Sequence, residues 1–306
     1  PEVPLSLGIV DYFQERGLRV FGPKQDAAIL ESSKAFAKNL MKKYSIPTAA
    51  YEVFRNAEDA KDKVDSFGFP VVIKADGLAA GKGVIISETK EDAINAIDDI
   101  MMDKQFGEAG NKIVLEEFLQ GKEASILAFV DGKTAIPMVS AQDYKRVFDD
   151  DKGLNTGGMG SVSPALYYNG EIAEEVMKTI IIPTVNAMTE EDREYKGVLY
   201  FGLMLTDKGP KVIEYNCRFG DPETQAVLLR LESDLVEIME AVIDGKLDTM
   251  DIEWAKNVAV CVVMASGGYP EDYTKGYEIK GLTDIEEGIV FHAGTKREDG
   301  KFLTNG

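Results

Sequence analysis

The sequence predicts an α+β protein in which most neighbouring strands are antiparallel. Asp131-Gly132 separates two apolar segments rich in β-branched and aromatic residues, and Asp-Lys-Gly-Pro at residues 207–210 separates two more. Such short turn sequences between apolar segments are typical of β-hairpins. Segments with apolar residues three or four positions apart, typical of helices, lie between them. Hairpins that alternate with helices favour antiparallel sheets covered by helices.

The first 50 residues are predicted to be mainly helical. Apolar spacing predicts a helix at residues 7–16, and GLRVF at residues 17–21 predicts a short buried strand. Helical spacing resumes over residues 25–44, where Ile46-Pro47 follows. Proline lacks a backbone N–H, so we expect that helix to end before it.

The remaining elements follow in order from about residue 51. Thr89 with Asp92 three residues later is similar to a capping box and predicts a helix that continues to residue 101. Further helices are predicted at residues 57–67, 171–188 and 223–243. Strands are predicted at residues 69–75, 83–87, 112–118, 124–130, 134–139, 197–205, 211–215, 258–264 and 289–293.

Composition excludes several classes of protein. The 306 residues carry a net charge of -19, which disfavours binding to nucleic acid or to an anionic membrane. Only Cys217 and Cys261 are present, which argues against a disulfide scaffold or a cysteine zinc cluster and fits a reducing compartment. No run of about 18 apolar residues predicts a membrane span, and no signal peptide is recognised. We therefore expect a cytoplasmic protein.

A glycine-rich segment between two predicted strands is the first candidate site. Gly77, Gly81 and Gly83 surround Lys82, so backbone N–H groups there can approach an anion closely. A P-loop or a dinucleotide fingerprint requires a different spacing and a following helix. The segment is therefore interpreted as a hairpin flap over phosphates, with Lys74 delivered by the preceding strand. An ordinary glycine-rich hairpin with solvated lysines has the same spacing.

A second candidate site lies at the end of a predicted strand. Side chains alternate across a strand, so Glu214, Asn216 and Arg218 are expected on one face, with Tyr215 and Cys217 in the core. One carboxylate and one amide oxygen beside phosphates suffice for Mg²⁺. Arg218 can hold a phosphate or carboxylate as a fork. A polar edge-strand face with a surface ion pair remains the alternative.

Two loops complete the candidate site. Asp221 is expected to cap a helix with Pro222 in its first turn, and such an N-terminus offers free N–H groups to an anion. The glycine-dense sequence NTGGMG at residues 155–160 follows a charged segment that contains Lys145 and Arg146, which suits phosphate or carboxylate capture. A mobile loop without a binding role has the same local sequence.

Taken together, the motifs resemble those of the phosphoribosylamine–glycine ligase family. FGP, SKAF, KADGLAAGKGV, EEFL, NTGGMG, EYNCRFGDPETQ, GGYP and FHAGT occur in that family's order and span essentially all 306 residues. The resemblance implies an ATP-grasp fold, with two α+β subdomains gripping ATP. It also implies ligation of glycine to 5-phosphoribosylamine through a glycyl phosphate, with ATP cleaved to ADP and phosphate and Mg²⁺ or Mn²⁺ as the metal.

The resemblance also implies roles for individual residues. Lys74 and Arg218 are expected to be catalytic, and Glu214 and Asn216 to bind the metal. The residues expected to bind ATP are Lys34, Lys74, Gly77, Gly81, Lys82, Gly83, Glu116, Glu117, Phe118, Leu119 and Glu123. Those expected on the glycine and ribosylamine side are Asn155, Thr156, Gly157, Gly158, Met159, Arg218, Asp221, Pro222, Glu223 and Thr224.

A domain division follows from the same resemblance. Residues 1–30 are expected to be the remnant of a Rossmann-like domain, 31–254 the ATP-grasp domain with a lid at 52–115, and 255–306 part of a C-terminal β-rich domain. Both ends look truncated, so we expect exposed apolar surface and association of the isolated chain. Another ATP-grasp carboxylate–amine ligase and a non-catalytic ATP-binding fragment are the alternative functions.

Overall fold

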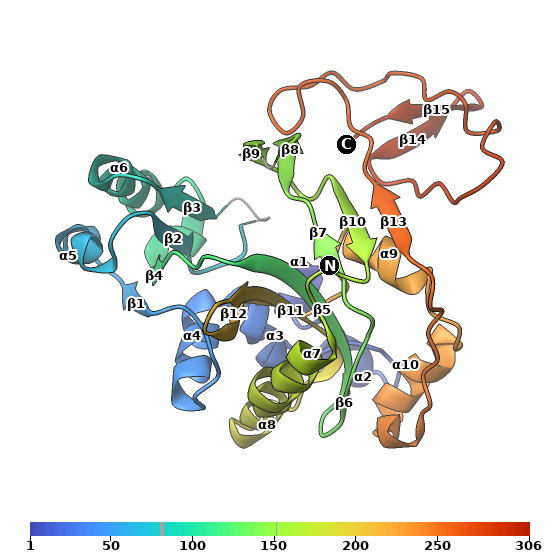
Figure 1. The fold of residues 1–306 in the computed structure, drawn as a ribbon, viewed down its shortest axis with the longest axis horizontal. Helices are drawn as coiled ribbons and strands as arrows, with labels where there is room; N and C mark the ends of the chain where they lie inside the picture. The colour runs from blue at the N-terminus through green and yellow to red at the C-terminus, as the bar shows by residue number, and fades with distance from the viewer. Residues whose placement is uncertain (80–82, 151) are drawn as a thin grey trace.

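Two four-stranded antiparallel sheets organise the molecule, and in Figure 1 one lies at the left and the other near the centre. The structure, a computed structural model, describes residues 1–79, 83–150 and 152–306. Among these residues no helix has the length and apolar character needed to cross a membrane. The predicted α+β class is confirmed.

The first sheet has the strand order β1-β4-β2-β3. Helices α5 and α6 pack on it, and the side chain of Thr89 caps α6 by accepting a hydrogen bond from Asp92 N at 3.2 Å, as predicted. The core of this unit consists of buried residues between Phe54 and Leu115 alone. Its elements are β1 (Tyr51–Phe54), α5 (Ala57–Lys63), η1 (Val64–Phe67), β2 (Val71–Ala75), β3 (Val84–Ser87), α6 (Lys90–Met101), η2 (Gly107–Asn111) and β4 (Ile113–Glu117).

The second sheet has the order β12-β11-β5-β6, and it has a hydrophobic core on each face. Helices α3, α4 and α8 bury one face around Phe201, whereas α9 and α10 pack against the other around Phe129 and Tyr200. Its strands are β5 (Lys122–Asp131), β6 (Ala135–Pro137), β11 (Lys196–Thr206) and β12 (Gly209–Asn216). The helices of the described chain outside the first unit are α1 (Glu2–Ser6), α2 (Ile9–Gln14), α3 (Gln25–Ser32), α4 (Lys34–Lys43), α7 (Gly170–Val176), η3 (Met177–Ile181), α8 (Ile182–Glu190), α9 (Glu223–Leu228), α10 (Leu235–Asp244) and η4 (Leu247–Thr249).

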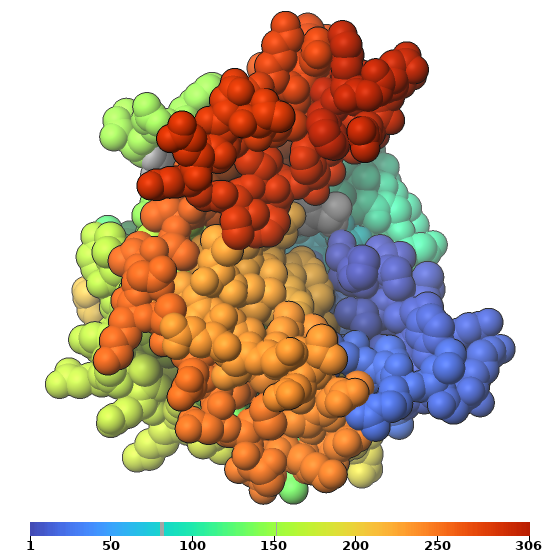
Figure 2. Space-filling view, turned by 90° about the vertical axis from the view of Figure 1, so that its right-hand side faces the viewer, coloured from blue at the N-terminus to red at the C-terminus, as the bar shows by residue number. Residues whose placement is uncertain are grey.

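A smaller sheet, β13-β10-β7, lies beside α9 and connects the second sheet to the C-terminal segment. In Figure 2 the C-terminal residues form a lobe at one end of the molecule. The remaining strands are β7 (Gln142–Asp143), β8 (Arg146–Phe148), β9 (Lys152–Asn155), β10 (Gly160–Ser163), β13 (Ala259–Val262), β14 (Thr295–Glu298) and β15 (Lys301–Thr304).

Two predicted helices are each divided into two. The helix predicted over residues 25–44 breaks at Ser33, whose backbone is extended and whose hydroxyl caps α4 by accepting from Phe36 N at 3.1 Å. The helix predicted over residues 223–243 breaks after α9, because Leu231 forms a β-bridge with Trp254 and Asp234 caps α10. In both places a local side-chain cap or a distant strand partner outweighs continuous helical spacing.

Two predicted strands are absent from the described residues. Residues 17–21 are irregular, with Leu18 53% exposed, and no described strand pairs with them. Residues 289–293 are also irregular, with Phe291 52% exposed, and the hairpin β14–β15 forms just after them. A strand needs a partner for its backbone groups, and apolar composition alone does not supply one.

Candidate active site

A row of polar side chains crosses one face of the second sheet. Gly202 on β11 pairs with Ser125 on β5 and with Glu214 on β12, so all three positions share one row. A Cβ at Gly202 would lie 3.2 Å from Glu214 Cγ, so glycine leaves room there for the carboxylate. Because side chains alternate along a strand, Glu123 and Asn216 lie on the same face. Tyr215 and Cys217 are buried in the opposite core, as predicted.

Four cationic side chains act electrostatically on the carboxylate of Glu214. Burial alone would raise the pKa of Glu214, but Lys145, Lys74, Lys34 and Arg218 outweigh burial, so its pKa is lowered. The carboxylate is therefore held in its charged form. The same cations can contact the phosphates of a nucleotide.

Lys74 is fixed between the two sheets by one hydrogen bond and one ion pair. Its Nζ donates to the carbonyl oxygen of Ile213 on β12 at 3.0 Å and lies 3.1 Å from Glu116 Oε1. Glu116 is only 3% exposed, and its second oxygen lies 2.7 Å from Lys38 Nζ. Burial lowers the pKa of Lys38 to about 8, although Glu116 opposes this shift. The Glu116 carboxylate thus orients two buried lysines at the base of the site.

Glu117 and its neighbours connect the two units. Glu117 Oε1 accepts from Lys211 Nζ at 2.9 Å and from Ala50 N at 3.0 Å. Phe118 follows with 37% of its surface exposed, and Leu119 is partly buried. The segment therefore runs from the end of β4 toward the second sheet with part of its surface exposed.

Asp76 fixes the loop after β2 to the start of α4. Its Oδ1 accepts from Ala35 N at 2.7 Å and from Ser33 Oγ at 3.0 Å, and Lys112 forms an ion pair with its other oxygen. Lys34 Nζ donates to Gly77 O at 3.0 Å. Burial lowers the pKa of Lys34, opposed mainly by Glu214. Gly81 and Lys82, both assigned to the flap, lie outside the described residues.

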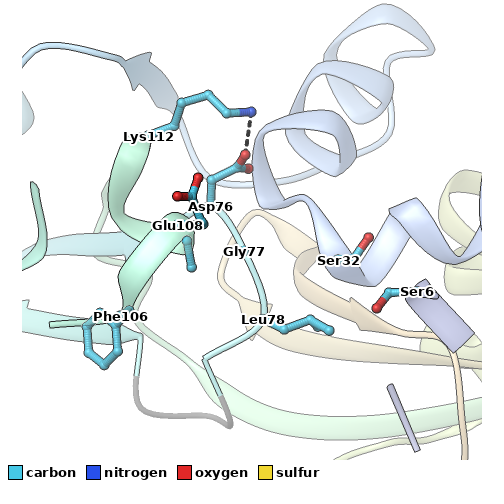
Figure 3. Close-up of a pocket in the computed structure, with 9 residues that line it drawn as sticks. Ser6, Ser32, Asp76, Gly77, Leu78, Phe106, Glu108 and Lys112 are labelled. Atoms are coloured by element: carbon cyan, nitrogen blue, oxygen red, sulfur yellow. Dashed lines mark ion pairs between the residues drawn. The ribbon is translucent and has the colours of Figure 1, made fainter. Parts of the chain in front are cut away.

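A cavity of about 420 Å³ lies beside this corner (Figure 3). In Figure 3 the ion pair of Asp76 and Lys112 lies at one side of it, and Ser6 and Ser32 project from neighbouring helices on another. The full lining is Ser6, Ser32, Asp76, Gly77, Leu78, Phe106, Glu108, Ala109 and Lys112. The cavity includes the start of the flap but neither of the predicted metal ligands.

The two predicted substrate loops are in direct contact. Gly158 has φ +120, and a Cβ there would lie 2.3 Å from Pro222 Cδ and 2.9 Å from Asp143 Oδ1. Thr156 holds the same loop by donating from its backbone N–H and its Oγ1 to Lys145 O, both at 2.8 Å. The sequence predicted these loops at one site without predicting their contact.

Glu223 is buried at the start of α9. Its Oε1 accepts from Ser125 Oγ at 3.0 Å, and that hydroxyl lies 2.9 Å from Tyr200 Oη. Burial, and then the charge of Glu223, raise the pKa of Asp143 to about 7. The start of α9 thus adds a second carboxylate next to the polar face.

The prediction that the side chain of Asp221 caps a helix is wrong. Helix α9 begins after Pro222 with no side-chain cap, and Asp221 instead accepts from Gln225 Nε2 at 2.6 Å. Thr224 stabilises the same turn, because its Oγ1 donates a hydrogen bond to Gly220 O at 2.5 Å.

Sequence reasoning missed three residues of the site. Lys38 was detectable, because it lies four positions after Lys34 and therefore on the same face of α4. Lys145 was noted only as a basic residue near the loop. Asp143 carried no signal, because its position depends on the pairing of Ser161 with Asp143 between β10 and β7.

Glu214 and Asn216 fit a divalent cation. Both offer oxygen atoms from one face of β12, Glu214 remains charged, and Mg²⁺ prefers oxygen ligands together with phosphates. Strand β12 ends at Asn216, so Arg218 lies beyond it, and its Nη2 lies 3.5 Å from Asn216 Oδ1 and 3.5 Å from Glu31 Oε1.

Two antiparallel sheets meet at a lysine-lined site, with the oxygen atoms of Glu214 and Asn216 on the second sheet, as in the ATP-grasp class. Biotin carboxylase from Campylobacter jejuni shares this fold, with a TM-score of 0.70 at 18% identity over 89% of this chain and 59% of that one. The predicted ATP-grasp fold is therefore confirmed.

Within this class, the phosphoribosylglycinamide synthetase ATP-grasp (A) domain matches residues 32–224, and the C domain of the same synthetase matches residues 259–306. The chain belongs to the phosphoribosylglycinamide synthetase family, as the sequence motifs predicted.

Relatives of this family match along the whole chain. Phosphoribosylamine–glycine ligases from Halalkalibacterium halodurans and Neisseria meningitidis serogroup A are each 54% identical over 100% of this chain, which covers 71% and 73% of their lengths. The crystal structure of the Thermotoga maritima ligase has a TM-score of 0.86 at 40% identity, over 94% of this chain and 72% of that one.

Proposed function

We propose that this chain joins glycine to 5-phosphoribosylamine, with cleavage of ATP to ADP and phosphate, and forms glycinamide ribonucleotide in purine biosynthesis. The observation that carries the proposal is the gathering of four cations around Glu214, on the sheet face that also carries Asn216. It occurs in a chain that is 54% identical over its full length to ligases of that name.

We assign the nucleotide to the junction of the two sheets. Lys34 and Lys74 would contact phosphate oxygens, because Lys74 is buried, Lys34 is half-buried, and both act electrostatically on Glu214. Glu123, at the exposed start of β5, would accept from the ribose hydroxyls. The adenine would lie along Glu116, Glu117, Phe118 and Leu119, and the flap at Gly77, Gly81, Lys82 and Gly83 would cover the phosphates.

We assign Glu214 and Asn216 to Mg²⁺ or Mn²⁺. The metal, when bound, would neutralise negative charge on the phosphate oxygens. The residues themselves supply fixed oxygen ligands on one strand face, and Arg218 next to Asn216 adds a positive charge.

The carboxylate of glycine is a poor electrophile, so the reaction must first activate it. An oxygen of the glycine carboxylate attacks the γ-phosphorus of ATP, and the bond to the bridging oxygen breaks with its electron pair on ADP. The amine then attacks the acyl carbon of glycyl phosphate, phosphate leaves with the C–O electron pair, and the amine loses a proton. Positioning and electrostatics dominate such a reaction. Lys74 and Arg218 would stabilise the charge on the transferring phosphoryl group.

We assign glycine and the ribosylamine to the two contacting loops. Gly158 lies against Pro222, so the loops form one continuous wall beside the polar face. The residues of this wall are Asn155, Thr156, Gly157, Gly158, Met159, Arg218, Asp221, Pro222, Glu223 and Thr224.

We also propose a division of the chain, with residues 1–30 as the remnant of a Rossmann-like domain, 31–254 as the ATP-grasp domain and 255–306 as part of a C-terminal domain. The separate core between Phe54 and Leu115 supports a lid at residues 52–115. We place the protein in the cytoplasm, which its two free cysteines support.

The test is ADP release from purified protein with magnesium, ATP, glycine and freshly prepared phosphoribosylamine, each substrate omitted in turn. The proposal predicts release only when glycine and the amine are both present. Release that continues without glycine would refute it, because ATP would then be spent on another acceptor.

A further inference from the structure

Lys145 is a cation of the site to which no role has been assigned above. It lies between β7 and β8, and its main chain is tied to the loop at residues 155–160. Lys145 O accepts two hydrogen bonds from Thr156, each at 2.8 Å. The preceding residue, Tyr144, donates from its N to Gly160 O at 3.0 Å and accepts from Met159 N at 2.7 Å. The backbone that carries Lys145 is therefore held on both sides.

The side chain of Lys145 points to the polar face of the second sheet. Its Nζ lies 3.6 Å from Glu123 Oε2, at the start of β5. Burial would lower its pKa, but Glu214, Glu123, Asp143 and Glu223 outweigh burial and raise it. These carboxylates belong to the nucleotide, metal and glycine sides of the site. Lys145 is thus held in its charged form by carboxylates from these sides of the site, with Glu123 in direct contact.

The other cations reach Glu214 from different elements. Lys34 and Lys74 come from α4 and β2, and Arg218 follows β12. Arg218 belongs to the glycine wall itself, and Lys145 is hydrogen-bonded to that wall through Thr156, whereas among the described residues Lys34 and Lys74 have no such link. A phosphoryl group that moves from ATP toward glycine therefore moves toward Lys145.

We propose, on the basis of the function proposed above, that Lys145 contacts the phosphoryl group as it passes from ATP to the glycine carboxylate. Its ammonium donates hydrogen bonds to the non-bridging oxygens of that group and transfers no proton. The new bond joins a glycine oxygen to the γ-phosphorus, and the broken bond leaves its electron pair on ADP. Lys145 lowers the barrier because the oxygens of the phosphoryl group come within its reach only during transfer.

The test compares Lys145→Met with Lys152→Met. Both variants remove one positive charge from the segment of β8 and β9, since Lys145 directly precedes β8 and Lys152 begins β9. Lys152 is exposed, with 72% of its side chain accessible beside Asp150. Removal of one transition-state donor lowers kcat by about 100- to 1000-fold, so this loss is expected for K145M. The KM for ATP is expected to change by less than about threefold, because a contact made only in the transition state leaves ground-state binding intact. K152M is expected to keep the wild-type kcat.

Two further measurements separate this role from a structural one. Hydroxylamine in place of phosphoribosylamine traps the activated glycine as its hydroxamate, and K145M is expected to slow trapping by the same factor as the complete reaction. Lys145→Arg retains the charge and is expected to be at least about 10-fold faster than K145M. Circular dichroism melting of each variant monitors folding, and K145R provides the comparison with wild type if K145M does not fold.

The inference is overturned if K145M keeps wild-type kcat, if only its KM for ATP rises, or if it forms hydroxamate at the normal rate. It is also overturned if K145R is folded yet as slow as K145M. Failure of the proposed function is a separate result, because the wild-type protein would then show no release of ADP dependent on glycine.

Discussion

Replacement of Gly158 by alanine should open the contact between the two substrate loops. The backbone of Gly158 has φ +120, and a Cβ would lie 2.3 Å from Pro222 Cδ, closer than any real contact between such atoms. A side chain in a sparsely populated backbone region costs about 1–3 kcal/mol, and overpacking costs about 1–3 kcal/mol more. We expect G158A to lower stability by about 2–6 kcal/mol, a large part of a typical total of about 5–15 kcal/mol.

The matched control for this variant is Gly157→Ala. A Cβ at Gly157 would meet only Tyr269 Oη, at 3.5 Å, which is an ordinary contact. Gly→Ala at a compatible position changes stability by less than about 1 kcal/mol. Thermal unfolding followed by circular dichroism measures both, and G158A is expected to melt at least about 4 °C below G157A. Equal melting temperatures would refute the proposed contact between the loops.

Three further outcomes are expected. Glu116→Gln removes the charged partner of Lys38 and Lys74, whose Nζ atoms lie 2.7 and 3.1 Å from the Glu116 carboxylate. Urea unfolding should show that the free energy of unfolding falls by about 3–5 kcal/mol. A fall below about 1 kcal/mol would contradict the buried network. The pKa of Asp143 is raised to about 7, so its contribution to stability is complete below about pH 4 and is lost as pH rises toward 7. The free energy of unfolding of Asp143→Asn, relative to that of the wild type, should therefore grow over this range by up to about 4 kcal/mol. A difference between the two proteins that does not depend on pH would exclude the shift. Glu214→Gln should weaken Mn²⁺ binding in the presence of ATP by about 10-fold or more in a magnetic-resonance titration, and unchanged binding would remove Glu214 from the metal site.

The sequence predicted those parts of the fold that depend on local pattern. Alternation along β12 predicted that Glu214 and Asn216 share one face while Tyr215 and Cys217 are buried, and the Asp131-Gly132 turn predicted the β5–β6 hairpin. Each of these features depends on residues within one strand or one turn, so a single segment contains the necessary information.

The features that were not predicted depend on distant partners. The break at Ser33 is reinforced by Asp76, which binds the first turn of α4 from the loop after β2. Lys145 reaches the site only because β7 pairs with β10 beside α9. Spacing along the chain carries no signal for contacts between residues so far apart in sequence.

The central claim, that this site activates the carboxylate of glycine by phosphorylation, is tested most directly by oxygen transfer. Glycine labelled with ¹⁸O in its carboxylate is incubated with ATP, magnesium, phosphoribosylamine and the protein, and the phosphate formed is analysed by mass spectrometry. Attack by a carboxylate oxygen on the γ-phosphorus, followed by loss of phosphate from the acyl carbon, predicts one ¹⁸O atom in each phosphate. Unlabelled phosphate formed together with product would contradict the account.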